Sequence, residues 1–376
     1  MDEAGRTAET VAGATTVALV YNRVGPDPFE QYRDVDPNTL DFVPAYPLAV
    51  ATVQEEYDSL AAALQAEGFA VRSVNLRERV TVLHALLRKD APQVVFNLVE
   101  FFRDDAALES AVAGVYDLYG VPYTGSSPFV LGLCRRKAMT KQLLLANGVP
   151  TPRYRLVRTA RFPRRHGLHY PLIVKPALED ASLGVWKESV AHSLPELEAA
   201  VQRLVSEQRV PILVEEFIEG REIHAAVLGN RPPRVLPIVE YDFSEVSTGH
   251  PPIISYDVKW NPLDETYHQV HEVCPAPLPR RLARRASAVA LEAFRVTGCR
   301  DYARIDMRLA RDGRIYVLEV NPNPDLTESV SFMLAAEQAG LSFGATLRKI
   351  VECALERTGG GGRNRGGAEA VKEERT

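Results

Sequence analysis

The chain is poor in several features, and each shortage excludes a class of protein. Its 376 residues include only 4 cysteines, which lack the paired spacing of a zinc site or a disulfide framework. We therefore expect reduced thiols and a cytoplasmic location. No apolar run approaches the ~20 residues that a membrane-spanning helix needs. A net charge of −5 gives no reason to expect nucleic acid or a membrane surface as a partner.

The composition and length are typical of a globular protein with two or three domains. Apolar residues make up 46% of the chain and charged residues 25%. Strand-like runs at 16–21, 69–74 and 94–98 alternate with helix-like segments at 53–67 and 80–89. This alternation predicts a parallel sheet covered by helices.

A predicted hairpin near the C-terminal end carries the most informative residues. Segments 302–309 and 315–320 have the pattern of strands, and Asp312-Gly313 between them is a hairpin turn signal. Because side chains alternate faces along a strand, one face of this hairpin should be apolar and the other polar.

Four polar side chains of the hairpin should share a face. Arg304 and Asp306 lie two residues apart on the first strand, as do Glu319 and Asn321 on the second. Two carboxylates and an amide oxygen suit magnesium, and an adjacent arginine suits phosphate chemistry. The alternative is a polar hairpin whose charges are simply solvated.

Two other segments have the character of a nucleotide site. Lys175 ends an apolar strand and is placed to meet phosphate oxygens, and the loop 177–185 that follows contains Ser182 and Gly184. A strand at 212–217 turns at a glycine, and its backbone could pair with an adenine edge. Taken singly, each pattern is better explained without a nucleotide: the first by a solvated lysine, and the second by exposed acids on a bulged strand.

The order of these segments resembles the ATP-grasp superfamily and, within it, the D-alanine–D-alanine ligase group. The similarity runs from about residue 94 to residue 356. It implies an α/β protein, α+β in the ATP-grasp part, in which a Rossmann-like N-terminal domain precedes a two-lobed ATP-grasp fold. The expected divisions are a disordered leader (1–15), an N-terminal domain (16–128), a central subdomain (129–211), a C-terminal subdomain (212–357) and a disordered tail (358–376).

The resemblance also implies roles for residues that match the family's motifs. The residues matched to the nucleotide are Lys137 and Lys175 for the phosphates, Ser182 and Gly184 in the covering loop, Glu215, Glu216, Phe217 and Ile218 around adenine, and Glu222 for ribose. Those matched to the chemistry are Lys259 near the terminal phosphate, Arg304 for the transferring phosphoryl group and the later oxyanion, and Asp306, Glu319 and Asn321 as metal ligands. The implied cofactors are ATP and Mg²⁺, with Mn²⁺ as an alternative and two ions expected.

The substrate end departs from the family pattern. A long proline-rich insertion follows residue 21, and neither the segment after the third strand nor the segment 322–330 matches the ligases. Acidic residues here would repel a carboxylate and favour a cationic or polar group. The candidate substrate contacts, each of which could equally be a surface charge, are Glu100, Arg103, Asp325 and Glu328.

These observations predict an ATP-dependent carboxylate–amine ligase that forms an amide through an acyl phosphate. Its expected partners are a small-molecule carboxylate and a small-molecule amine, both amino-acid-like, and a homodimer is left open. Other readings are a ligase that modifies peptides or proteins, a D-alanine–D-alanine ligase, and a non-catalytic ATP-binding regulator. A complete metal set disfavours the regulator, because a protein that only binds nucleotide does not need it.

Overall fold

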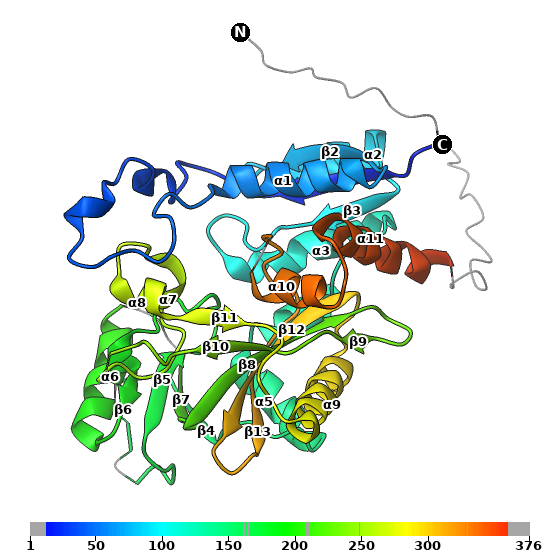
Figure 1. Cartoon of the computed structure of the whole chain (residues 1–376). Helices are drawn as coiled ribbons and strands as arrows, with labels where there is room; N and C mark the ends of the chain where they lie inside the picture. The colour runs from blue at the N-terminus through cyan, green and yellow to red at the C-terminus, as the bar shows by residue number, and fades with distance from the viewer. Residues whose placement is uncertain are drawn as a thin grey trace, which may run out of the picture.

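Three β-sheets and the helices around them build the molecule, which is described here from a computed structural model (Figure 1). The described residues are 13–160, 162–163, 165–207, 209, 211–247, 249–328 and 330–359. Most of the expected leader and tail therefore falls outside them. The mixed α/β architecture predicted from the sequence is confirmed.

The strands are β1 (Thr16–Tyr21), β2 (Ala70–Asn75), β3 (Val94–Asn97), β4 (Tyr154–Val157), β5 (Leu172–Pro176), β6 (Val190–Ala191), β7 (Ile212–Glu216), β8 (Gly220–Leu228), β9 (Arg234–Val235), β10 (Val239–Asp242), β11 (His271–Val273), β12 (Tyr302–Ala310) and β13 (Ile315–Asn321). The helices are α1 (Val53–Ala66), α2 (Val80–Lys89), α3 (Glu109–Tyr119), α4 (Pro128–Cys134), α5 (Lys137–Ala146), α6 (Leu194–Ser206), α7 (Tyr256–Trp260), α8 (Glu265–Gln269), α9 (Arg280–Thr297), α10 (Ser331–Gln338) and α11 (Phe343–Gly359).

The N-terminal sheet is parallel, with the order β2-β1-β3. Alternate residues of β1 pack on opposite faces, as strand geometry requires. Val17 and Leu19 belong to a core formed with α1 and α11, whereas Ala18 and Val20 pack with α2 and α3. The last helix of the chain thus returns to cover the first sheet.

The largest sheet has the order β11-β10-β8-β12-β13, and β9 pairs with β8. One face is apolar and packs against α9, as in the buried cluster that joins Ile223, Ala225, Ile305 and Met307 to Ala290. The other face carries the charged residues between these positions. Strand alternation therefore directs every second residue of β8 and β12 away from α9.

The third sheet is antiparallel, with the order β4-β7-β5-β6, and α6 packs on it (Figure 1). Strand β7 pairs with β4 and β5, so this sheet contains residues on both sides of the expected division at 211/212. The domain limits remain a proposal.

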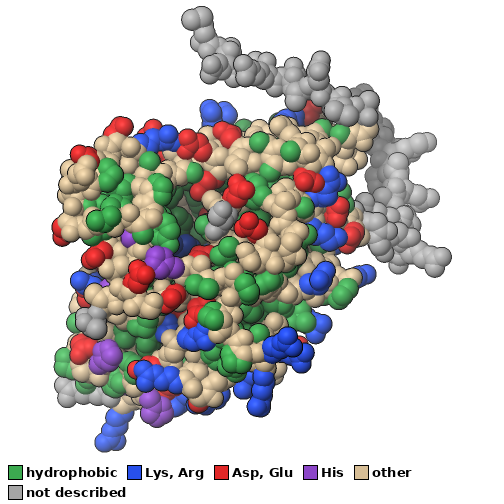
Figure 2. All heavy atoms as spheres, viewed as in Figure 1, with side chains coloured by type: hydrophobic (Ala, Val, Ile, Leu, Met, Phe, Trp, Pro, Cys, Tyr) green, Lys and Arg blue, Asp and Glu red, His purple; other side chains and the backbone are tan. Residues whose placement is uncertain are grey.

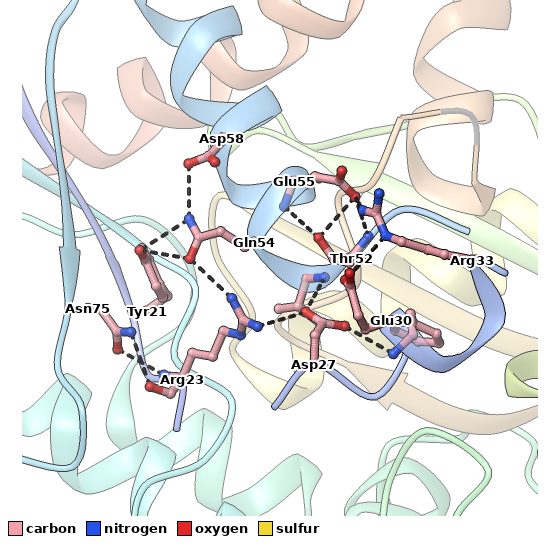
Figure 3. A network of polar contacts seen from close by, with 12 residues as sticks. Tyr21, Arg23, Asp27, Glu30, Arg33, Thr52, Gln54, Glu55, Asp58 and Asn75 are labelled. Atoms are coloured by element: carbon pink, nitrogen blue, oxygen red, sulfur yellow. Dashed lines mark hydrogen bonds and ion pairs between the residues drawn. The ribbon is translucent and has the colours of Figure 1, made fainter. Parts of the chain in front are cut away.

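The proline-rich insertion after β1 is fixed at both of its ends by polar contacts (Figure 3). Asp27 is the centre: its Oδ2 accepts from the Val53 amide at 2.9 Å, its Oδ1 accepts from the Phe29 amide at 3.0 Å, and Arg23 lies 3.2 Å from Oδ2. Thr52 caps α1 in a reciprocal arrangement with Glu55. These contacts connect the first strand, the insertion and the start of α1.

The insertion also packs on the segment that contains α7 and α8. The ring of Phe29 stacks on Trp260 with centroids 6.0 Å apart, and Tyr46 stacks on His268 at 6.0 Å. The Tyr46 amide hydrogen-bonds to Nδ1 of His268 at 3.2 Å. In Figure 1 the insertion accordingly lies beside α7 and α8.

We expect Asp27→Ala to lower the free energy of unfolding by about 1–3 kcal/mol, because two part-buried amides and Arg23 would lose their acceptor. Thermal or urea unfolding measures this change. Asp34→Asn is the matched control, since Asp34 is exposed. Equal stability of the two variants would show that the Asp27 contacts do not stabilise the fold.

Candidate active site

A cavity of about 450 Å³ lies where the three sheets, the insertion and the α7 segment meet. Figure 2 shows this face of the molecule hollowed below the insertion, with acidic side chains gathered beside the hollow. Residues predicted for the nucleotide, the metal and the substrate line it together with residues that the sequence did not single out. Of the predicted residues, those along the cavity wall are Glu100, Lys137, Lys175, Ser182, Glu215, Glu216, Phe217, Ile218, Glu222, Lys259, Arg304, Asp306, Glu319, Asn321 and Asp325.

The predicted hairpin forms one wall of the cavity. Asp306 of β12 lies directly opposite Glu319 of β13, and Arg304 lies opposite Asn321. The register then shifts, because Met307 pairs with Val317 and leaves Leu318 as an extra residue. Because of this bulge, Val317 stays in the core while Glu319 and its partner Asp306 face the cavity.

Arg304 and Asp306 form a two-pronged ion pair. The Arg304 Nε lies 2.7 Å from Asp306 Oδ1, and its terminal nitrogen lies 2.9 Å from Oδ2. Burial alone would raise the pKa of Asp306, but the guanidinium outweighs it and holds that pKa well below its usual range. Asp306 is therefore an anion, as a metal ligand must be.

Glu319 faces a lysine from another part of the chain. Lys137, at the start of α5, lies 3.0 Å from Glu319 Oε2 and 2.6 Å from Asp180 Oδ1. The pKa of Glu319 is raised by burial and by the carboxylates of Asp180 and Asp306, although Lys137 lowers it. Burial would lower the pKa of Lys137, but the raising effect of Glu319 and Asp180 is larger, so the pKa of Lys137 lies above its ordinary value. A cation is thus held between two acids at the part of the cavity predicted to bind phosphate.

A second buried pair lies behind the predicted adenine segment. Glu215 is fully buried, and its Oε1 lies 3.3 Å from Lys175 and 3.2 Å from Lys141. Lys141 also donates to Thr151 at 2.7 Å. Burial, together with repulsion from Lys175, lowers the pKa of Lys141 to about 8, although Glu215 opposes this. Sequence reasoning missed Lys141, which could have been found because it lies one helical turn after Lys137.

The segment after β7 offers backbone groups to a ligand. The Phe217 amide donates to the Pro171 carbonyl at 2.9 Å, and the Ile218 carbonyl accepts from Arg308 at 3.0 Å. Within the described ranges, the Phe217 carbonyl and the Ile218 amide make no hydrogen bond. One acceptor and one donor at the cavity wall match the edge of an adenine ring.

The predicted ribose acid is engaged by an arginine that the sequence analysis did not identify. Arg308 donates to Glu222 Oε2 at 2.8 Å and to the Pro252 carbonyl at 2.7 Å, and its guanidinium lies 4.7 Å from the centre of the Phe217 ring. Burial would raise the pKa of Glu222, but His224 and Arg308 together lower it. The sequence could have predicted Arg308, because it lies two residues after Asp306 and so shares the face of β12 that carries Arg304 and Asp306.

The loop 177–185 lies against α7. Ser182 Oγ donates to the Ile254 carbonyl at 2.8 Å, and Trp260 Nε1 donates to the Ala181 carbonyl at 2.8 Å. Gly184 is outside the cavity wall; it has a φ of +75°, and a Cβ there would lie 2.7 Å from Pro176. Lys259 of α7 lines the cavity, where burial and the Arg304 charge lower its pKa.

The end of the cavity formed by α1, α3 and the segment after β3 is acidic. Enclosure by the cavity walls, which keeps these carboxyl groups from bulk water, raises the pKa of Glu56 to about 8, of Glu100 to about 7 and of Glu109 to about 8, and repulsion among neighbouring carboxylates adds to each shift. Glu100 is open to the cavity, and Asp325 contributes to its shift. Arg103 and Glu328, the other predicted substrate residues, are exposed and do not line the cavity. Glu56 and Glu109 come from α1 and α3, which the sequence analysis did not connect with the site.

The predicted metal ligands have suitable chemistry for Mg²⁺. Two carboxylates and an amide oxygen are hard ligands, and the carboxylates lie across one strand pair. Asn321 is oriented by its Oδ1, which accepts from the Asn323 amide at 3.0 Å. Among the described residues there is no group of three or more His, Cys, Asp or Glu side chains arranged to hold a metal. The predicted set does not need one, because its third ligand is an amide.

Comparison with known proteins gives the same picture. Residues 143–352, more than half of the chain, match the family described as D-ala D-ala ligase C-terminus. A D-alanine–D-alanine ligase of Desulforudis audaxviator is 31% identical over 303 residues, which cover 80% of this chain and 92% of that protein. The chain belongs to the D-alanine–D-alanine ligase family. The predicted resemblance is confirmed, and with it the general activity of an ATP-dependent ligase that forms C–N bonds.

Other family members extend the comparison. A D-alanine–D-alanine ligase of Moorella thermoacetica is 30% identical over 307 residues, covering 79% of this chain and 93% of that protein. An uncharacterized protein of Sinorhizobium fredii, y4sG, is 36% identical over 269 residues, covering 72% of this chain and 76% of that one. A Bacillus anthracis ligase structure complexed with ATP shares the fold, with a TM-score of 0.69, 21% identity, and coverage of 93% of this chain and all of that one. Members of this ligase family use ATP and Mg²⁺.

In the described part of the chain, no helix is long and apolar enough to cross a membrane.

The raised pKa of Glu109 predicts a stability change with pH. Because its folded-state pKa is about 8 against an ordinary 4.5, the neutral form is favoured in the fold and ionisation costs stability as pH rises between these values. Glu109→Gln should therefore leave Tm almost unchanged at pH 5 and raise it by about 2–4 °C at pH 8.5, without nucleotide. Thermal melts at both pH values measure this, with Glu337→Gln, at an exposed position, as control. A pH-independent difference would contradict the assignment.

Proposed function

We propose that the protein joins an amino-acid-like carboxylate to an amine, using ATP to form an acyl phosphate and then an amide. The observation that carries this is the meeting of Lys137, Lys175, Arg304 and the hairpin acids at one cavity wall. Cations neutralise charge that spreads over a phosphoryl group in transfer, and hard oxygen ligands suit magnesium. The two carboxylates and the amide at this wall would hold Mg²⁺, which would neutralise phosphate charge. We also propose that two ions bind here and that Mn²⁺ can replace Mg²⁺.

The chain's own groups divide the work along the cavity. Lys137 and Lys175 bind phosphate oxygens, and the free backbone groups at Phe217 and Ile218 receive the adenine edge. Arg304 faces the point of transfer, where it steadies first the phosphoryl oxygens and later the oxyanion. The loop 177–185 covers the phosphates and excludes water, because an acyl phosphate hydrolyses readily.

The charge of the substrate end favours a positively charged substrate group. The raised pKa values of Glu56, Glu100 and Glu109 mean that ionising them in the empty cavity is costly, and a bound cation would offset that cost by stabilising their ionised form. A free carboxylate at the same place would add to that cost. We therefore propose that the amine substrate carries its positive charge here, which disfavours a second D-alanine. A ligase acting on a peptide and a homodimer both remain compatible with this proposal.

The role of Arg304 is tested by Arg304→Ala. We expect kcat to fall about 10²–10³-fold, the cost of losing one oxyanion-stabilising group, while ATP binding persists. Isothermal titration with ATP and an ADP-release assay measure the two effects. Arg314→Ala removes an exposed arginine from the same hairpin and should change neither. Near-normal turnover of Arg304→Ala would defeat the assignment.

The substrate proposal is tested by an ADP-release screen over pairs of carboxylates and amines, with products identified by mass spectrometry. We expect amines without a free carboxylate, including diamines and amino-acid amides, to release more ADP than D-alanine does. Amide formation separates a ligase from a kinase that stops at phosphoryl transfer, and from a nucleotide-binding regulator without turnover. Robust D-alanyl-D-alanine formation would overturn the substrate part of the proposal and leave the ATP chemistry in place.

A further inference from the structure

A buried histidine lies between the predicted ribose acid and the predicted metal acid. His224 stands on β8 directly across from Asp306 of β12, and Glu222 precedes it by two residues on the same face. It is only 3% exposed, yet it lines the cavity. The sequence offered no reason to place a functional histidine here.

The two ring nitrogens of His224 have different surroundings. Nδ1 lies 3.4 Å from Ser331 Oγ and 3.6 Å from Asp306 Oδ1. Nε2 lies 3.9 Å from Glu222 Oε1, beyond hydrogen-bonding distance, and has no hydrogen-bond partner among the described residues. One edge of the ring is therefore held by the protein, and the other is open to a ligand.

The orientation of the ring is fixed from behind. It packs on Tyr241 with ring centroids 4.6 Å apart, and Tyr241 donates its hydroxyl hydrogen to Glu272 at 2.5 Å. Glu272 also accepts from the Ser331 amide at 2.6 Å. Burying a polar nitrogen without a partner is costly, so a ring held in this way is typical of a site that is completed by its ligand.

The position of the open nitrogen suggests which part of a nucleotide it meets. Glu222 marks the ribose end and Asp306 the metal-bound phosphates, and the atoms between these ends are the α- and β-phosphates. Their oxygens accept hydrogen bonds, and a bond from an imidazole N–H to a charged oxygen is among the stronger ones. We propose that His224 donates from Nε2 to an α- or β-phosphate oxygen of the nucleotide. This rests on the proposed ATP-dependent function.

The test compares nucleotide binding by variants of His224. His224→Leu removes the donor and should weaken ADP binding about tenfold or more, with adenosine binding changed less than about twofold. His224→Gln can place an amide N–H near the position of Nε2 and should recover most of the ADP affinity. His192→Gln is the matched control, because His192 is exposed. Isothermal titration measures each dissociation constant, and thermal melts confirm folding.

Each titration is repeated in EDTA to separate direct contact from an effect through the metal ligand. A direct contact predicts the same loss for ADP with and without Mg²⁺. A loss seen only with Mg²⁺ would mean that His224 acts through Asp306 and would overturn the proposal. So would an equal loss for adenosine and ADP, which indicates packing, or an unchanged ADP affinity in His224→Leu. Failure of the unaltered protein to bind ADP would instead reject the proposed function and this inference with it.

Discussion

Pairing of opposite charges inside the cavity is the constraint on which the rest of the site depends. Four carboxylates are taken out of water at its nucleotide end, and each is placed against a cation. The pairs are Arg304–Asp306, Lys137–Glu319, Lys175–Glu215 and Arg308–Glu222. A buried charge without a partner costs several kcal/mol, so these pairs favour the pairing of β8 with β12 and of β5 with β7, and they join α5 to β13. The same cations are the groups that a polyphosphate would meet.

The two ends of the cavity differ in how far their charges are balanced. At the nucleotide end, cations keep the pKa values of Asp306, Glu215 and Glu222 low. At the acidic end, Glu56, Glu100 and Glu109 form no ion pair with a cation among the described residues, and the pKa values of Glu56 and Glu109 rise to about 8. Without a cation the neutral, protonated form of these acids is favoured, and a positively charged ligand would favour their ionised form. In the proposed function, the cavity would receive an anion at one end and a cation at the other.

Sequence patterns predicted the hairpin well because its signals are local. The Asp-Gly turn and the two-residue alternation placed Arg304, Asp306, Glu319 and Asn321 on one face, as the register confirms. The bulge at Leu318 was missed, because an extra residue in one strand leaves no trace in a short apolar pattern. Arg103 and Glu328 were assigned by position in the chain, and neither lines the cavity, since the course of a loop depends on packing elsewhere.

The sequence by itself determined the family of this protein and its use of ATP, because the motifs that carry the resemblance are short and ordered along the chain. Only the tertiary structure decided what else enters the cavity. Glu56 of α1, Glu109 of α3 and Phe29 of the insertion reach the site from segments far from the motifs. Lys141 lies one helical turn after Lys137, and His224 lies two residues after Glu222 on β8. Their importance, however, becomes visible only from their burial and from their partners across the fold. Such contacts join residues distant in sequence, and no local pattern records them.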